Sequence, residues 1–254
     1  MSNPASPPGL VLLSSGEPGV RTLTLNDHPR RNAITPEMEP QLAAAVAAVA
    51  ADSEARVLIV TGTGSAFCAG ADLAATFGQP DEPVPALRRR LLRLYDSFLA
   101  IARLEIPTIA AVNGPAVGAG VNLALACDVR IAGPRARFGL TFSRLGLHPG
   151  GGATWFLTRA VGRQRALSLL LDGATLDGPD ALRLGLALDL AEDPVAAARE
   201  RAARWAALDP ELARNVKRTV SQAELGPLPE TVELESWAQA ASARAGDPAR
   251  FSRP

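Results

Sequence analysis

Apolar residues follow two kinds of spacing along the chain, and these predict strands and helices. Residues 20–26 (Val-Arg-Thr-Leu-Thr-Leu-Asn) alternate between polar and apolar, as the residues of a half-buried strand do. Residues 56–61 are mainly a continuous apolar run, which is typical of a strand buried on both faces. Shorter runs predict further strands at 107–113, 128–132 and 137–141.

Helical spacing accounts for most of the remaining chain. Thr35-Pro36-Glu37 supplies an N-cap residue, a proline for the first turn and an acidic residue, so it opens an alanine-rich helix that ends near Ala51. Apolar residues three and four apart predict further helices at 86–104, 152–161, 163–172, 178–186, 195–208, 210–224 and 230–244. No strand pattern follows Pro194.

The repeated order of strand, turn and helix predicts parallel strands joined by helical crossovers, which is an α/β fold. We expect residues 1–10 to be a flexible tail, residues 11–193 the α/β core, and residues 194–254 an all-helical C-terminal region. A helical region of this size buries little apolar surface by itself. We therefore expect it to pack on the core or on another subunit.

Composition narrows the possible partners. The 254 residues include 26 basic and 26 acidic side chains, a balance that argues against nucleic acid or an anionic membrane surface as the main partner. Two cysteines are too few for a disulfide framework, and the start of the chain lacks the pattern of a signal peptide. We expect a cytoplasmic protein. Lys217, the only lysine, is expected at the surface of a C-terminal helix.

Two glycine-rich turns carry the candidate chemistry, each at the end of an apolar strand. The first contains Ala69-Gly70-Ala71, and the second contains Gly118-Ala119-Gly120 just before a short apolar helix. Small residues let a ligand approach the backbone amides, and the first amides of a helix carry the positive end of its dipole. Two such turns facing each other predict an oxyanion hole, although either turn alone is equally typical of close helix-on-strand packing.

The sequence lacks the usual motifs of nucleotide-binding sites, serine hydrolases and metal sites. The spacing Gly114-x-x-x-Gly118-x-Gly120 is not that of a dinucleotide-binding loop, and the chain contains no Walker A sequence. It also contains no Gly-x-Ser-x-Gly and no cluster of His, Cys and Asp at metal-ligand spacing. We therefore expect no metal, and no cofactor other than a bound substrate.

Five motifs stand in order along the chain, and together they identify a family. They are Leu25-Asn26-x-x-Pro29-x-x-Asn32-Ala33-Ile34, Phe67-Cys68-Ala69-Gly70-Ala71-Asp72-Leu73, Ala111-Val112-Asn113-Gly114-x-Ala116-x-Gly118-x-Gly120, Cys127-Asp128-Val129-Arg130-Ile131-Ala132 and Arg137-Phe138-Gly139. With this order and these intervals, the chain resembles the enoyl-CoA hydratase/isomerase, or crotonase, superfamily from about Leu23 to Ala191.

The resemblance implies a spiral of ββα units whose C-terminal helices build homotrimers, often paired into hexamers. It implies an acyl-CoA thioester as ligand and an enolate-like anion stabilised by the backbone amides of Ala71 and Ala119. The coenzyme A part would lie against residues that the motifs mark by position: Arg31, Ala33, Ala69, Asp72, Leu73 and Gly118. The carboxylate of Asp72 is expected to brace its own turn as well.

The acid/base positions depart from the family pattern. The two glutamates of the family's hydratases match Asn122 and Phe142, and the carboxylate of many isomerases matches Gly150. Two-glutamate hydration is therefore not expected. His148 either moves a proton or pins its loop by hydrogen bonding. Asn122 is a polar substitute that orients a water or a substrate group, and Phe142 with Trp155 indicates an apolar pocket or ordinary core.

The sequence thus predicts a lyase or isomerase of acyl-CoA metabolism with an intact oxyanion hole and an altered acid/base set. The alternative is a protein that binds acyl-CoA, or assembles with a partner, and has lost its chemistry. Clp-type serine peptidases share the spiral fold, but the matching loops of this chain hold no Ser/His/Asp arrangement.

Overall fold

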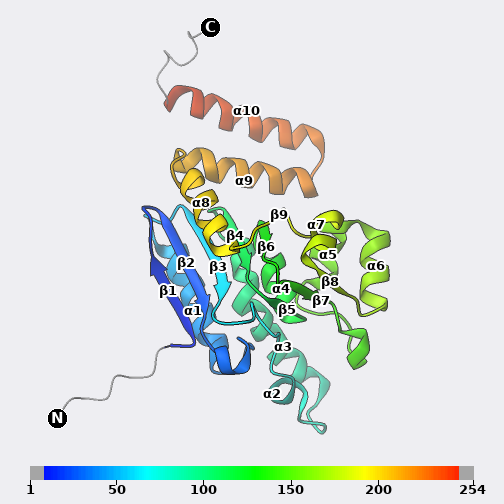
Figure 1. The fold of residues 1–254 in the computed structure, drawn as a ribbon. Helices are drawn as coiled ribbons and strands as arrows, with labels where there is room; N and C mark the ends of the chain where they lie inside the picture. The colour runs from blue at the N-terminus through cyan, green and yellow to red at the C-terminus, as the bar shows by residue number, and fades with distance from the viewer. Residues whose placement is uncertain (1–8, 246–254) are drawn as a thin grey trace, which may run out of the picture.

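A six-stranded sheet forms the centre of the molecule, in a computed structural model that describes residues 9–245 (Figure 1). Its strands, in spatial order, are β1 (Val11–Ser15), β2 (Val20–Leu25), β3 (Val57–Gly62), β4 (Thr108–Val112), β6 (Val129–Ala132) and β9 (Asp189–Leu190). β1 pairs with β2 in antiparallel fashion, and every later pair is parallel. The predicted parallel sheet is confirmed.

A second, smaller sheet lies beside the first. It contains β5 (Pro115–Val117), β7 (Arg137–Gly139) and β8 (Thr175–Asp177), with β5 parallel to β7 and β7 antiparallel to β8. Since β5 and β7 each follow a strand of the large sheet, the chain alternates between the two sheets as it advances. This alternation gives the spiral of ββα units that the sequence implied.

Helices cover both sheets and form the C-terminal part of the described chain, up to residue 245. They are α1 (Met38–Ala51), α2 (Leu73–Phe77), α3 (Val84–Leu99), α4 (Ala119–Leu125), α5 (Ala153–Val161), α6 (Arg163–Leu171), α7 (Gly178–Leu184), α8 (Pro194–Ala206), α9 (Pro210–Leu225) and α10 (Leu228–Ala245), with 3₁₀ turns at His28–Arg30, Ala100–Arg103 and Ser143–Leu145. None of the helices between residues 9 and 245 has the length and apolar character needed to cross a membrane.

The core divides between the two faces of the large sheet. Along β3, Leu58 and Val60 belong to one apolar cluster, and Val57 and Ile59 to another, because successive side chains of a strand point to opposite faces. The second cluster is closed by Ala198 and Ala202 of α8. Both faces of β3 are therefore buried, as its continuous apolar run predicts.

The C-terminal helices are tied to the core by an ion pair. The Nζ of Lys217 on α9 lies 2.9 Å from a carboxylate oxygen of Asp128 and also donates to the carbonyl of Ile106, at 2.9 Å. The lysine side chain is only 12% exposed. The expectation of a surface lysine is wrong, because α9 folds back onto the end of the sheet at this point.

Most predicted elements are confirmed, with shifted ends. The helix predicted at 86–104 ends at Leu99 and continues as a 3₁₀ turn, and the strands β1, β5, β8 and β9 were not predicted. Most of the predicted tail, residues 1–10, lies outside the described residues. Its last residue, Leu10, donates its N–H to the side-chain oxygen of Gln41 at 2.8 Å, so it is held against α1.

Candidate active site

The two glycine-rich turns are joined to each other by backbone hydrogen bonds. The first turn (residues 62–72) follows β3, and the second turn (residues 113–120) follows β4 and includes β5. The N–H groups of Phe67 and Cys68 donate to the carbonyl of Pro115 at 3.0 and 3.1 Å, and the N–H of Val117 donates to the carbonyl of Cys68 at 3.0 Å. The structure therefore brings the two predicted turns together as one unit.

Two glycines are required where the turns touch. A Cβ on Gly120 would lie 2.2 Å from the carbonyl oxygen of Cys68, and a Cβ on Gly70 would lie 2.5 Å from that of Val117. Gly70 also has φ +98°, a conformation that side chains rarely adopt. The position of a Cβ on Gly70 is 3.5 Å from the amide nitrogen of Ala119, so the first turn borders the start of α4.

The backbone N–H groups of Ala71 and Ala119 both lie at this junction. Ala119 is the first residue of α4, where an N–H has no acceptor within the helix. Ala71 lies beside Ile34 in a parallel bridge that uses the N–H of Asp72 and the carbonyl of Gly70, and not the N–H of Ala71. Among the described residues, neither the Ala71 nor the Ala119 amide donates a hydrogen bond.

The segment 31–34 lies along the first turn. The N–H of Ala69 donates to the carbonyl of Arg31 at 3.0 Å, and the N–H of Ile34 donates to the carbonyl of Gly70 at 2.8 Å. Asn32, fully buried with φ +58°, donates from its side chain to the carbonyls of Thr63 and Ala66. Four of the residues predicted to contact coenzyme A therefore lie on two adjacent backbones: Arg31, Ala33, Ala69 and Leu73.

Asn122 on α4, which the family resemblance matches to the first hydratase glutamate, is almost fully buried. Its Nδ2 donates to the carbonyl of Gly150 at 2.8 Å, which fixes the orientation of the amide. Its Oδ1 is buried and has no hydrogen-bond partner among the described residues. The predicted polar substitute is therefore held with one acceptor free.

Tyr95 on α3 is a residue of this region that the sequence did not single out. A Cβ on Gly150 would lie 2.2 Å from its hydroxyl oxygen, and a Cβ on Gly151 would lie 3.2 Å from its ring and 2.9 Å from the Nδ2 of Asn122. Burial raises the pKa of this phenol above its ordinary value. The only signal in the sequence was that Tyr95 is the single tyrosine of the chain.

The two aromatic residues of the predicted pocket, Phe142 and Trp155, lie in different places. A ring carbon of Phe142 lies 3.9 Å from the position of a Cβ on Gly118, so Phe142 sits beside the second turn. Trp155 is 43% exposed, with the guanidinium of Arg159 3.8 Å from its ring centre. Trp155 instead lines a cavity between α5 and α9, together with Glu224 of α9.

His148 and Asp72 both make local hydrogen bonds. The His148 ring is exposed, and its Nδ1 lies 2.8 Å from the carbonyl oxygen of Pro149. The carboxylate of Asp72 accepts from the N–H of Ala75 at 3.1 Å and so caps α2. Within residues 9–245, no group of three or more His, Cys, Asp or Glu side chains is arranged to hold a metal ion.

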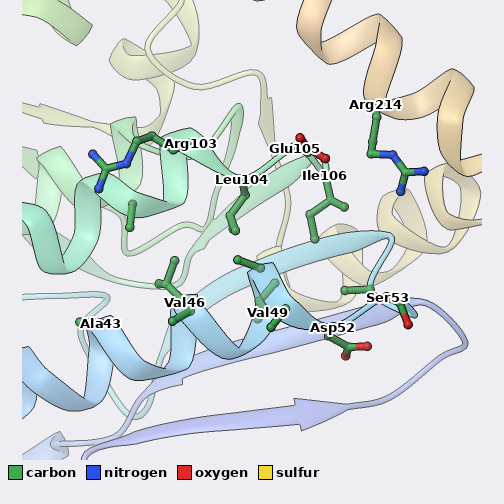
Figure 2. A pocket seen from close by; sticks show the side chains of 15 residues that line it. Ala43, Val46, Val49, Asp52, Ser53, Arg103, Leu104, Glu105, Ile106 and Arg214 are labelled. Carbon is green, nitrogen blue, oxygen red and sulfur yellow. The ribbon is translucent and has the colours of Figure 1, made fainter.

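A cavity of about 700 Å³ lies elsewhere, between α1, the segment 100–106 and Arg214 of α9 (Figure 2). Val46 and Val49 of α1 line it on one side, Leu104 and Ile106 point toward them from the opposite side, and Arg103 and Asp52 also belong to its lining. None of the candidate site residues predicted from the sequence lines this cavity.

Comparisons with known proteins agree with the family resemblance that the sequence motifs show. The family model described as enoyl-CoA hydratase/isomerase matches residues 15–245. The Mycobacterium tuberculosis protein named "Probable enoyl-CoA hydratase EchA14" is 54% identical over 212 residues, which cover 82% of this chain and 80% of that protein. The 1,2-epoxyphenylacetyl-CoA isomerase of Escherichia coli is 38% identical over 239 residues, covering 93% and 91%.

A solved structure from Thermobifida fusca YX has the same fold. It is described as "a putative enoyl-CoA hydratase" in complex with acetoacetyl-CoA. It superimposes with a TM-score of 0.83 at 32% identity, and the match covers 94% of this chain and 96% of that one. The predicted fold class is confirmed.

Proposed function

Because the chain belongs to the enoyl-CoA hydratase/isomerase family, we propose that it processes acyl-CoA thioesters by stabilising an enolate-like anion at the thioester oxygen. The observation that supports this most directly is the pair of unpartnered N–H groups, of Ala71 and Ala119, on turns bonded to each other. Each such donor typically contributes about 10²–10³ in rate, because it meets charge that develops during the reaction.

The coenzyme A part of the ligand lies, in this proposal, along the backbone of Arg31, Ala33, Ala69 and Leu73. These residues belong to two adjacent segments that are bonded to each other beside Ala71, where the proposal places the thioester oxygen. Asp72 and Gly118 belong to the same ligand-binding set, through the turns that they shape. The acetoacetyl-CoA complex of the Thermobifida fusca neighbour supports a thioester of this kind as the ligand.

The reaction differs from two-glutamate hydration in this proposal. Asn122 and Phe142 stand at the two glutamate positions, and neither side chain transfers a proton at neutral pH. Isomerisation, decarboxylation, thioester hydrolysis and weak hydration stay open, because all of them pass through an anion at the thioester oxygen. The isomerase among the relatives supports a reaction other than hydration.

Mass spectrometry in D₂O tests the proposal. A panel of acyl- and enoyl-CoAs is incubated with the protein, and deuterium at the α-carbon or a new product mass is followed. We expect protein-dependent labelling, and the mass change names the reaction. If every thioester returns unlabelled while calorimetry detects binding, the enzyme proposal is wrong.

A second candidate is an acyl-CoA-binding protein without chemistry, favoured by the exposure of His148 and its bond to Pro149. His148→Ala separates the two. If His148 moves the proton, the variant loses at least about 10²-fold in rate while binding survives. If the chain only binds acyl-CoA, the variant binds the thioester with unchanged affinity, and neither the variant nor the unmodified chain shows a reaction rate.

We also propose that the chain acts as a homotrimer or homohexamer in the cytoplasm. No residue of α9 is buried in the single chain, and Val216 and Val220 on α9 and Trp237 on α10 are 54%, 65% and 69% exposed. Figure 1 shows these two helices stacked at one end of the molecule, beyond the sheet. Light scattering after size-exclusion chromatography tests this: a mass of one chain contradicts it.

A further inference from the structure

Arg90 of α3 joins α2 to the segment that connects the two helices, residues 78–83. Its Nη2 donates to the carbonyl of Thr76, near the end of α2, and to the carboxylate of Glu82 in the connecting segment, at 2.6 Å in each case. We call this arrangement of Arg90, Thr76 and Glu82 the Arg90 clasp. Figure 1 shows α2 and α3 at the end of the molecule away from α9 and α10.

The Arg90 clasp lies mostly out of water. The Arg90 and Glu82 side chains are 22% and 15% exposed, so their charges are less screened than those of an exposed pair such as Arg183 with Asp180. The Nε of Arg90 is buried and has no hydrogen-bond partner among the described residues, which costs free energy. The bonds to Thr76 and Glu82 must outweigh this cost, since they hold the guanidinium where it lies.

Apolar packing does little to fix α2 against α3. α2 has five residues, of which Thr76 is the buried one, and a helix this short is not stable by itself. A cavity of about 220 Å³ also separates the helices, lined by Ala75 of α2, Leu94 of α3 and Glu39 of α1 among others. The carboxylate of Asp72 caps the start of α2, and the Arg90 clasp holds its end.

Both helices border the candidate site. α2 begins two residues after Ala71, and α3 carries Tyr95, whose hydroxyl lies beside Gly150. The Ala71 amide does not depend on the clasp, because the carbonyl of the same peptide group, that of Gly70, accepts from the N–H of Ile34. The clasp therefore acts on the wall that α2 and α3 form, and leaves the amide donors in place.

We propose that Arg90 is a positioning residue that holds α2 against α3 and so fixes the wall on the acyl side of the site. It touches no reacting atom and acts through the position of α2. A thioester beside a loosened wall keeps its coenzyme A contacts, while its acyl group is held less precisely, which lowers the rate more than the binding. This inference rests on the proposed function, since the Ala71 and Ala119 amides place the thioester.

The rate of α-deuterium exchange tests this role, with the acyl-CoA that the unmodified chain labels fastest. Arg90→Met removes both bonds and keeps the aliphatic stem, and we expect the maximal rate to fall about tenfold while KM stays within about twofold. Arg90→Lys keeps the charge and one bond, so it should recover most of the rate. Arg89→Met is the control and should change neither value, because Arg89 is exposed on the same helix and its side chain has no ion pair or hydrogen bond among the described residues.

Glu82→Ala removes the clasp from its other side, in an exposed connecting segment that tolerates substitution. We expect the same lowering of the maximal rate at constant KM, so the test does not depend on the folding of Arg90→Met. An unchanged maximal rate in folded Glu82→Ala and Arg90→Met overturns the positioning role and leaves the proposed function standing.

Amide hydrogen exchange, followed by mass spectrometry of peptides, gives a readout without turnover. In Arg90→Met we expect faster exchange in residues 73–83, with residues 31–34 and 62–71 unchanged. Faster exchange throughout the chain, with KM and the maximal rate altered together, would mean that Arg90 only stabilises the fold, and this overturns the inference. If the unmodified chain labels no thioester, the proposed function fails, and the positioning role fails with it.

Discussion

Gly120→Ala is the substitution that addresses the contact between the two turns most directly. The added methyl group would lie 2.2 Å from the carbonyl oxygen of Cys68, and real Cβ contacts do not come below 3.0 Å. The neighbour is backbone and not the end of a flexible side chain, so the turns must separate by about 0.8 Å or more. This displacement moves the amide of Ala119 away from the first turn and from the Ala71 amide.

The expected effect on rate follows from this displacement. Misplacing a catalytic group by about 1 Å costs about 10²-fold, which matches the lower end of the loss for removing one oxyanion donor. We expect the rate of α-deuterium exchange into an acyl-CoA to fall about 10²-fold in Gly120→Ala. Overpacking also costs about 1–3 kcal/mol of stability, so circular dichroism must show that the variant is folded at the assay temperature.

Gly16→Ala is the matched control, because a Cβ on Gly16 meets nothing within 4 Å. It should exchange at the rate of the unmodified chain. A folded Gly120→Ala protein that exchanges within threefold of the unmodified chain would refute the argument that this contact positions the donors.

Three further predictions concern stability and protonation. Lys217→Met leaves Asp128 without its ion-pair partner, and we expect a loss of about 1–3 kcal/mol and a lower Tm in thermal denaturation; an unchanged Tm contradicts this. Asp193→Ala removes the cap of α8 and should cost about 1 kcal/mol, or roughly 2–4 °C in Tm. Burial raises the pKa of the Cys68 and Cys127 thiols to about 12 from 9.0, so their contribution to stability is present below pH 9 and is lost as the pH rises toward 12. Both thiols should therefore stay unreactive toward a disulfide reagent at pH 8 until the chain unfolds, and rapid labelling of the native protein would contradict their burial.

The parts of the fold that local pattern determines were predictable. The buried run of β3 and the helices after Pro194 show their spacing in the sequence, and the structure confirms both. β8 has three residues and β9 has two, which is too short for any periodicity to show. These strands form because each pairs with the edge of a neighbouring strand. The sequence of one short segment does not show that such an edge is available.

The candidate site also has a part that the sequence predicts and a part that it does not. The turns at Gly70 and Gly120 were predictable because their close approach demands glycine, a requirement that the sequence displays. Tyr95 was not, because its position beside Gly150 depends on how α3 packs against a loop 55 residues later in the chain. Trp155 was misplaced for the same reason, since helical spacing does not tell which side of α5 faces the site.

The predictable part of the site consists of backbone groups, and the part that was not predicted consists of side chains. The groups that would hold an anion are backbone amides, and backbone packing fixes them whichever side chains surround them. The groups that would move a proton are side chains, so they can differ without disturbing the turns, as we propose for Asn122 and Phe142 at the positions that the resemblance matches to the two glutamates. If the proposed function holds, the fate of the α-proton, more than sequence similarity, therefore decides which reaction this chain performs.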